Sequence, residues 1–163
     1  VGTLMTNLGL ENKLKELGLE FIRANVGDRY VLEKLLEEGW LYGGESSGHL
    51  LCLDYHTTGD GIIAALQILT AMRHHGSLLR ELVADLKMYP QKMVNVEWEQ
   101  GRDWTECQEL VDVKRQLEAE LGQKGRVLIR PSGTEPKLRL MVEAEELSQV
   151  EDGIKRLLAV NLV

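Results

Sequence analysis

The spacing of apolar residues changes once along this chain, near residue 89, and that change limits its fold more than any single motif does. Before it, strand-like runs alternate with helical patterns, such as the apolar repeats of residues 10–17 and 29–39, each ended by a glycine. Residues 40–55 read as two strands around a glycine-rich turn, and Asp60 can cap the apolar helix that follows. Strands and helices in alternation predict a layered α/β unit with a largely parallel sheet.

After the change, the expected order is strand, helix, strand, strand, helix. Residues 91–99 alternate in period two, and Thr105 with Gln108 can form a capping box for a leucine-rich helix. Two strand-like runs joined by a polar loop lie within residues 126–144, and an amphipathic helix follows. This order predicts a small α+β domain with an antiparallel sheet and two helices. We therefore expect two domains, at residues 1–88 and 89–163.

Composition excludes several classes of protein. The net charge of −7 argues against nucleic acid and membrane surfaces as partners, because both require a basic face. It does not exclude a small anionic ligand, which needs only a local cluster of donors. The two cysteines, Cys52 and Cys107, have neither a disulfide spacing nor a metal-ligand spacing, and no long apolar run is present. These features favour a cytoplasmic protein.

The polar loop between the last two expected strands carries an unusual set of donors. Arg130 offers a bidentate guanidinium, Ser132 and Thr134 offer hydroxyls, and Gly133 exposes the backbone N–H groups around it. The loop is not a Walker loop, because G-x-x-x-x-G-K-[ST] is absent and no helix follows. The residue types leave two interpretations open: a phosphate cradle, or a hairpin turn whose polar side chains face water.

The glycine-rich turn of the first half is a second candidate site. It contains G-x-S-x-G, but a strand-like run follows where a serine hydrolase would have a helix. Glu45 beside Ser47 could bind sugar hydroxyls, and His49 could transfer a proton near neutral pH. The alternative is a tight turn in which Glu45 accepts hydrogen bonds from backbone N–H groups and His49 packs at the start of a strand.

Three motifs together resemble those of the α-D-phosphohexomutase superfamily: GGESSGH (43–49), TTGDG (57–61) and RPSGTEPKLRL (130–140). With NVGDRYVLEKL (25–35), the chain is most similar to the bacterial members that act on glucosamine phosphates. The resemblance covers the whole chain. It implies an isomerase that interconverts glucosamine 6-phosphate and glucosamine 1-phosphate through a bisphosphorylated sugar, for cell-wall precursor synthesis. The alternatives are a member acting on glucose or mannose phosphates, and a phosphosugar-binding module without catalysis.

By the same resemblance, Glu45 and Ser47 bind sugar hydroxyls. The resemblance assigns the non-reacting phosphate to four residues of the polar loop: Arg130, Ser132, Gly133 and Thr134. Several relatives carry a histidine where this chain has Asp28 and Arg29, so an acid–base role is open between these two residues and His49. Lys137 and Arg139 lie two apart on a strand and face the same side, so one or both could add positive potential to the phosphate site.

Members of the superfamily have four domains, and their phosphoserine loop and Mg²⁺-binding carboxylate loop do not occur in this sequence. We therefore expect the chain to be part of a longer mutase. It would comprise a third domain truncated at its N-terminus, with the sugar-binding loop, and a complete fourth domain with the phosphate-binding loop. The missing N-terminal domains of the same chain would supply the phosphoserine and the Mg²⁺ ligands. The present residues offer no metal ligands and are expected to be inactive alone.

Overall fold

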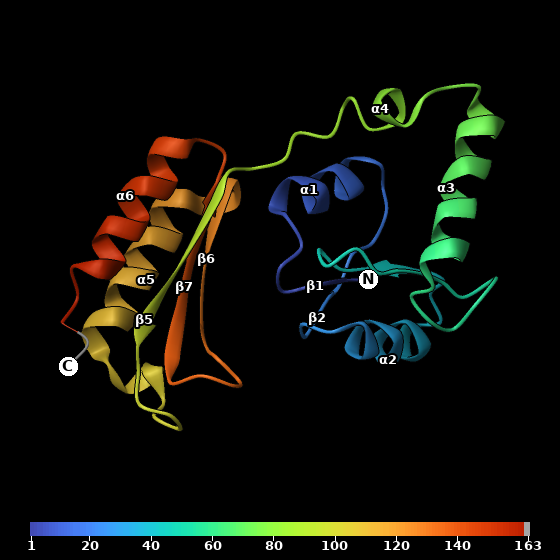
Figure 1. Ribbon diagram of the computed structural model, residues 1–163. Helices are drawn as coiled ribbons and strands as arrows, with labels where there is room; N and C mark the ends of the chain where they lie inside the picture. Colours follow the sequence, from blue (N-terminus) through green and yellow to red (C-terminus); the bar gives the residue numbers. More distant parts are fainter. Residues whose placement is uncertain (162–163) are drawn as a thin grey trace. The chain divides into compact units, whose positions relative to one another are not determined.

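The computed structural model describes residues 1–161. The chain divides into two compact units, and the boundary in the sequence lies between Lys87 and Met88 (Figure 1). The first unit contains β1 (Gly2–Thr3), α1 (Leu8–Glu16), β2 (Arg23–Ala24), α2 (Asp28–Glu38), β3 (Tyr42–Gly44), β4 (Leu50–Cys52), α3 (Gly61–His75) and α4 (Leu79–Leu82). The second contains β5 (Gln91–Glu97), η1 (Trp104–Glu106), α5 (Gln108–Leu121), η2 (Gly122–Lys124), β6 (Gly125–Pro131), β7 (Lys137–Ala144) and α6 (Leu147–Leu158). The expected fold class, a layered α/β unit followed by a small α+β unit, is confirmed.

The strands of the first unit pair in both directions. β1 and β2 are parallel, whereas β3 and β4 form an antiparallel hairpin. Val1 joins the two pairs: its amino group donates to Tyr42 O at 2.8 Å, and Gly44 N donates to Val1 O at 3.0 Å. The expectation of a largely parallel sheet is therefore wrong for the hairpin, because a short turn returns the chain directly and a parallel pair needs a long crossover.

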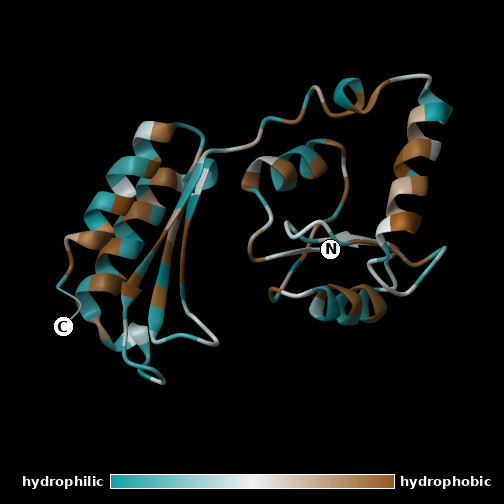
Figure 2. Cartoon of the chain, viewed as in Figure 1, coloured by the Kyte–Doolittle hydropathy of each residue, from teal (hydrophilic) through white to brown (hydrophobic). Residues whose placement is uncertain are grey.

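Burial within the first unit is uneven. Its core consists of residues of β2, α2 and β4, among them Val31 and Leu35, which are fully buried. Helix α3 has no buried residue, although apolar residues, brown in Figure 2, occur along its length. Ile62, for example, is 74% exposed. No helix within residues 1–161 is both long enough and apolar enough to cross a membrane.

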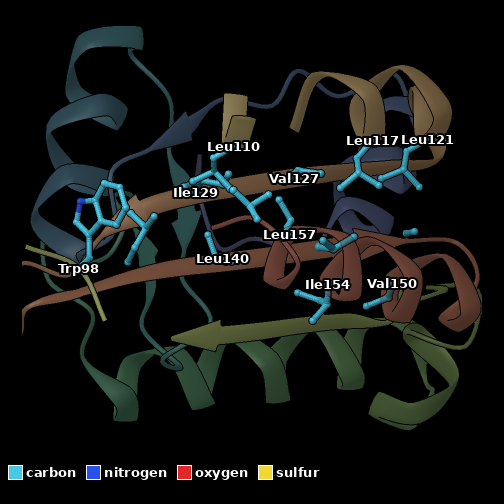
Figure 3. Packing of buried hydrophobic residues seen from close by; sticks show 14 residues of the cluster. Trp98, Leu110, Leu117, Leu121, Val127, Ile129, Leu140, Val150, Ile154 and Leu157 are labelled. Carbon is cyan, nitrogen blue, oxygen red and sulfur yellow. The ribbon is translucent and has the colours of Figure 1, made fainter. Parts of the chain in front are cut away.

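The second unit is a three-stranded antiparallel sheet in the order β5–β7–β6, with α5 and α6 on one face (Figure 1). Alternate residues of the central strand β7, including Leu138, Leu140 and Val142, are completely buried in the core. Figure 3 shows leucines of α5 and apolar residues of α6 packing against β6 and β7. Because side chains alternate along a strand, the residues between them, including Arg139, lie on the face opposite the helices.

Two neighbouring leucines of α6 test this assignment of the core. Leu157 is fully buried, whereas Leu158 is 48% exposed. Leu157→Ala should lower the free energy of unfolding of the second unit by about 2–5 kcal/mol, because it removes buried methyl groups and leaves a cavity. Leu158→Ala, the matched control, should cost less than about 0.5 kcal/mol. Urea unfolding followed through the amide NMR signals of β7 measures both, and equal costs would contradict the packing described.

Candidate functional site

The loop between β3 and β4 is organised by the carboxylate of Glu45. Ser47 donates its hydroxyl hydrogen to Oε1 of Glu45 at 2.6 Å, and Nδ1 of His49 lies 3.0 Å from the same oxygen. The backbone N–H of Gly27 donates to Oε2 at 3.1 Å. The Glu45 side chain is only 10% exposed. The turn requires Gly48, whose φ of 101° is one that side-chain-bearing residues rarely adopt.

These contacts engage one ring nitrogen of His49, Nδ1. Nδ1 lies between the Ser47 hydroxyl, at 2.9 Å, and the Glu45 carboxylate. Because an ionised carboxylate only accepts hydrogen bonds, Nδ1 carries the proton and Nε2 is the acceptor of the neutral ring. The ring also packs against Gly59, where an added Cβ would lie 3.0 Å from its Cδ2 atom. Nε2 of His49 is thus the ring nitrogen that neither Glu45 nor Ser47 contacts.

The loop before α2 meets the hairpin through the backbone of Gly27, not through the side chains that follow it. Asp28 accepts a hydrogen bond from the backbone of Arg29 at 2.8 Å. The guanidinium of Arg29 pairs with Glu33 at 2.9 Å, and this hydrogen bond raises the pKa of Arg29. No hydrogen bond or ion pair joins the guanidinium to the hairpin within residues 1–161. The structure therefore gathers three of the expected residues: Glu45, Ser47 and His49. It does not bring the side chains of Asp28 and Arg29 to them.

The polar loop joins β6 to β7 in the second unit. Ser132 N donates to Lys137 O at 2.8 Å, and Pro136 O accepts from a backbone N–H just beyond β5 at 3.0 Å. Gly133 and Thr134 are exposed between these anchors, and no group in residues 1–161 accepts a hydrogen bond from their backbone N–H groups. Free N–H groups in a turn are suited to binding an anion.

Arg130 and Arg139 lie directly opposite each other in the register of β6 and β7. In the described part of the chain, Nε of Arg130 is buried without a hydrogen-bond partner, and no carboxylate pairs with either guanidinium. Burial and, second, the charge of Arg139 lower the pKa of Arg130. Arg139 donates from Nη2 to the hydroxyl of Ser132 at 3.3 Å, and Ser132 is buried. Two guanidiniums without counterions beside a hydroxyl suit a phosphate.

Of the two basic residues of β7, Lys137 and Arg139, it is Arg139 that lies beside Arg130 and Ser132. The ammonium of Lys137 lies 3.8 Å from the Glu135 carboxylate, and Lys137 faces Glu97 of β5 in register. Sequence spacing puts Lys137 and Arg139 on one face of the strand but does not distinguish between them. The pairing of β6 with β7 distinguishes them, because it places Arg139 opposite Arg130.

The described residues do not fit a Mg²⁺ site. Within residues 1–161, no three histidine, cysteine, aspartate or glutamate side chains lie close enough together to hold a metal ion. The carboxylate of Glu45 is surrounded by donors, and that of Glu135 lies beside Lys137.

Two family models match the chain. The model described as "Phosphoglucomutase/phosphomannomutase, alpha/beta/alpha domain III" matches residues 1–89, and "Phosphoglucomutase/phosphomannomutase, C-terminal domain" matches residues 93–160. The chain belongs to the phosphoglucomutase/phosphomannomutase family.

Among curated relatives, it is similar to the phosphoglucosamine mutases of Bordetella parapertussis, with 62% identity over 157 residues, and Janthinobacterium sp. (strain Marseille), with 58% over 162 residues. These matches cover 96% and 99% of this chain but 35% and 36% of the relatives, so the chain spans about a third of their length. A solved structure of Aspergillus fumigatus N-acetylphosphoglucosamine mutase in complex with GlcNAc-6P and magnesium matches with a TM-score of 0.76 and 20% identity. That match covers 96% of this chain and 40% of the other. At this identity the likeness shows a shared fold.

The hydrogen bond from Ser47 is the largest of the effects that lower the pKa of Glu45 below its ordinary value of 4.5. A carboxylate with a lowered pKa in the folded state stabilises the fold above the unfolded pKa, and this contribution is lost as the pH falls through the lower, folded value. Ser47→Ala should therefore raise the pKa of Glu45, measured by ¹³C NMR titration of its carboxyl carbon. Ser46→Ala, at an exposed neighbour, is the control. An unchanged pKa in Ser47→Ala would contradict the geometry.

Proposed function

We propose that this chain is the sugar- and phosphate-binding part of a phosphoglucosamine mutase, an isomerase that interconverts glucosamine 6-phosphate and glucosamine 1-phosphate through a bisphosphorylated sugar. The similarity to phosphoglucosamine mutases along the chain supports the substrate. In this proposal, residues 1–88 correspond to the third domain of such enzymes and residues 89–163 to the fourth. The whole enzyme would act in the cytoplasm and feed cell-wall precursor synthesis.

The observation that carries the proposal is the pair of guanidiniums without counterions, Arg130 and Arg139, beside the free N–H groups of the polar loop. Like charges directly opposite each other in a sheet destabilise it, so the pair favours a bound anion. Arg130, with the hydroxyls of Ser132 and Thr134 and the N–H groups around Gly133, would hold the non-reacting phosphate of the substrate. A solvated hairpin turn would not account for a buried Nε atom without a hydrogen-bond partner, because buried polar groups are normally paired.

The hairpin loop of the first unit would bind the sugar. An ionised carboxylate accepts about four hydrogen bonds, and Glu45 accepts three, so it retains capacity for a sugar hydroxyl. Ser47 gives its hydrogen to Glu45 and would accept from a second sugar hydroxyl. Nε2 of His49 would take the proton from the hydroxyl that is phosphorylated, or return it to the one that is freed. The phosphoserine and the Mg²⁺ ligands would come from other parts of the enzyme, and the latter would neutralise charge on the transferred phosphoryl group.

Replacing Arg130 separates the phosphate cradle from the hairpin turn. Arg130→Ala should weaken binding of both glucosamine 6-phosphate and inorganic phosphate by roughly ten- to a hundredfold, because a charge-assisted contact of about 1.5–3 kcal/mol is lost. Arg130→Lys should recover only part of this loss, since an ammonium lacks the planar fork. NMR titration of the 163-residue chain measures both affinities. The matched control is Arg115→Ala, at an exposed position of α5. Unchanged affinity for both ligands in Arg130→Ala would refute the cradle.

The chain should also fail to catalyse the exchange alone. Its 163 residues contain no loop like the phosphoserine loop of the superfamily, so there is no phosphoryl donor. Incubation of the purified chain with glucosamine 6-phosphate and a trace of the bisphosphate should give no glucosamine 1-phosphate. A longer protein that includes these residues should convert it, and Glu45→Ala in that protein should reduce discrimination between sugars more than phosphate affinity. Turnover by the 163-residue chain, with host mutase excluded, would contradict the assignment.

A further inference from the structure

We propose that Arg139 is a positioning residue that directs the hydroxyl hydrogen of Ser132 toward the ligand. The polar loop would therefore bind the dianionic form of a phosphate monoester in preference to its monoanion. This inference rests on the proposed function, since it assumes that the loop holds a phosphate. It adds the protonation state that the loop selects, and it gives a role to Arg139, which lies on strand β7 and not in the polar loop itself.

The argument begins with the contact between Arg139 and Ser132. An arginine side chain has donors and no acceptor, so in the 3.3 Å contact Nη2 of Arg139 donates and the Ser132 oxygen accepts. The hydrogen of Ser132 must then point away from Arg139. Ser132 is 8% exposed and its backbone is tied to Lys137, so the side chain has little freedom to turn elsewhere. Within residues 1–161 no group accepts that hydrogen, so the hydroxyl is left as a donor for a ligand.

With Ser132 as a donor, nearly every group facing the loop donates. Arg130 contributes an unpaired Nε, and Gly133 and Thr134 contribute backbone N–H groups without acceptors in the part of the chain that the structure describes. A dianionic phosphate has only acceptors to offer such a cluster, whereas the P–OH group of the monoanion must donate its hydrogen to something. The donors therefore favour the dianion.

The surrounding charges act in the same direction. Arg130 and Arg139 face each other across the two strands, and the β5 residue opposite Arg139 is the neutral Asn95. Two carboxylates near the loop in sequence or in strand register lie by Lys137: Glu97 on β5 faces it in register, and Glu135 of the loop lies 3.8 Å from its ammonium. Two guanidiniums without counterions gain more from a divalent anion than from a monovalent one.

The test compares two anions at two pH values. A phosphate monoester loses its second proton near pH 6, so at pH 5 only about a tenth of glucosamine 6-phosphate is dianionic. We expect its affinity for the 163-residue chain to fall about tenfold between pH 7.5 and pH 5, as a monoester pKa near 6 implies. Inorganic sulfate is divalent at both pH values and should bind equally at both, which controls for titration of the protein itself.

Arg139→Gln identifies the residue responsible. The glutamine carbonyl can accept from a P–OH group, and Ser132 is free to rotate, so the pH dependence should shrink to less than about threefold while overall affinity drops. A double-mutant cycle provides a second readout: Ser132→Ala should weaken binding in the unsubstituted chain but have little further effect in Arg139→Gln, because Arg139 acts through Ser132. Arg115→Gln, which removes one charge from α5, should change neither quantity.

The outcomes separate this inference from the proposed function. If the unsubstituted chain bound neither glucosamine 6-phosphate nor sulfate at either pH, the proposed function would fall, and this inference with it. Binding of equal strength at both pH values would overturn the inference alone. So would Arg139→Gln with the full tenfold pH dependence, or additive losses in the cycle with Ser132→Ala.

Discussion

The register of β7 between its two neighbouring strands is the constraint on which the second unit depends. Because side chains alternate across a strand, this register sends Leu138 and Leu140 into the core and leaves Arg139 on the other face, opposite Arg130. A slip of one residue would expose the leucines and turn the guanidinium into the core. The same backbone hydrogen bonds therefore specify both the core and the polar loop, so mutations that loosen the sheet must also disturb the candidate phosphate site.

A cross-strand pair of arginine and glutamate on the same face shows what is unusual about Arg130 and Arg139. Arg126 of β6 faces Glu143 of β7, and the two side chains form an ion pair with Glu143 fully buried. Four residues further along β6, Arg130 faces Arg139 instead of a carboxylate. A glutamate at position 139 would neutralise Arg130 in the same way and relieve the like-charge contact. The proposed phosphate would account for the second arginine, at a cost in stability when the loop is empty.

Regular apolar spacing allowed most of the fold to be predicted from the sequence. The hairpin of β3 and β4, the order of elements in the second unit and the cap of α3 by Asp60 are all confirmed. The capping box at Thr105 was wrong: Asp103 accepts from Thr105 N and caps the short turn η1, and α5 begins only at Gln108. Aspartate and threonine both cap well, so composition cannot decide between neighbouring candidates when a 3₁₀ turn precedes the helix.

Residue types predicted which side chains belong to the candidate site, but not which of them meet. Sequence spacing places Glu45, Ser47 and His49 on one face of an extended strand. The chain instead turns at Gly48, and Ser47 and His49 both contact one carboxylate oxygen of Glu45. Likewise, Lys137 is closer to the polar loop in sequence, but the pairing of β6 with β7 brings Arg139 to Ser132. Contacts of this kind depend on turn geometry and strand register. Sequences with the same apolar pattern can differ in both, so the pattern alone does not determine which residues meet.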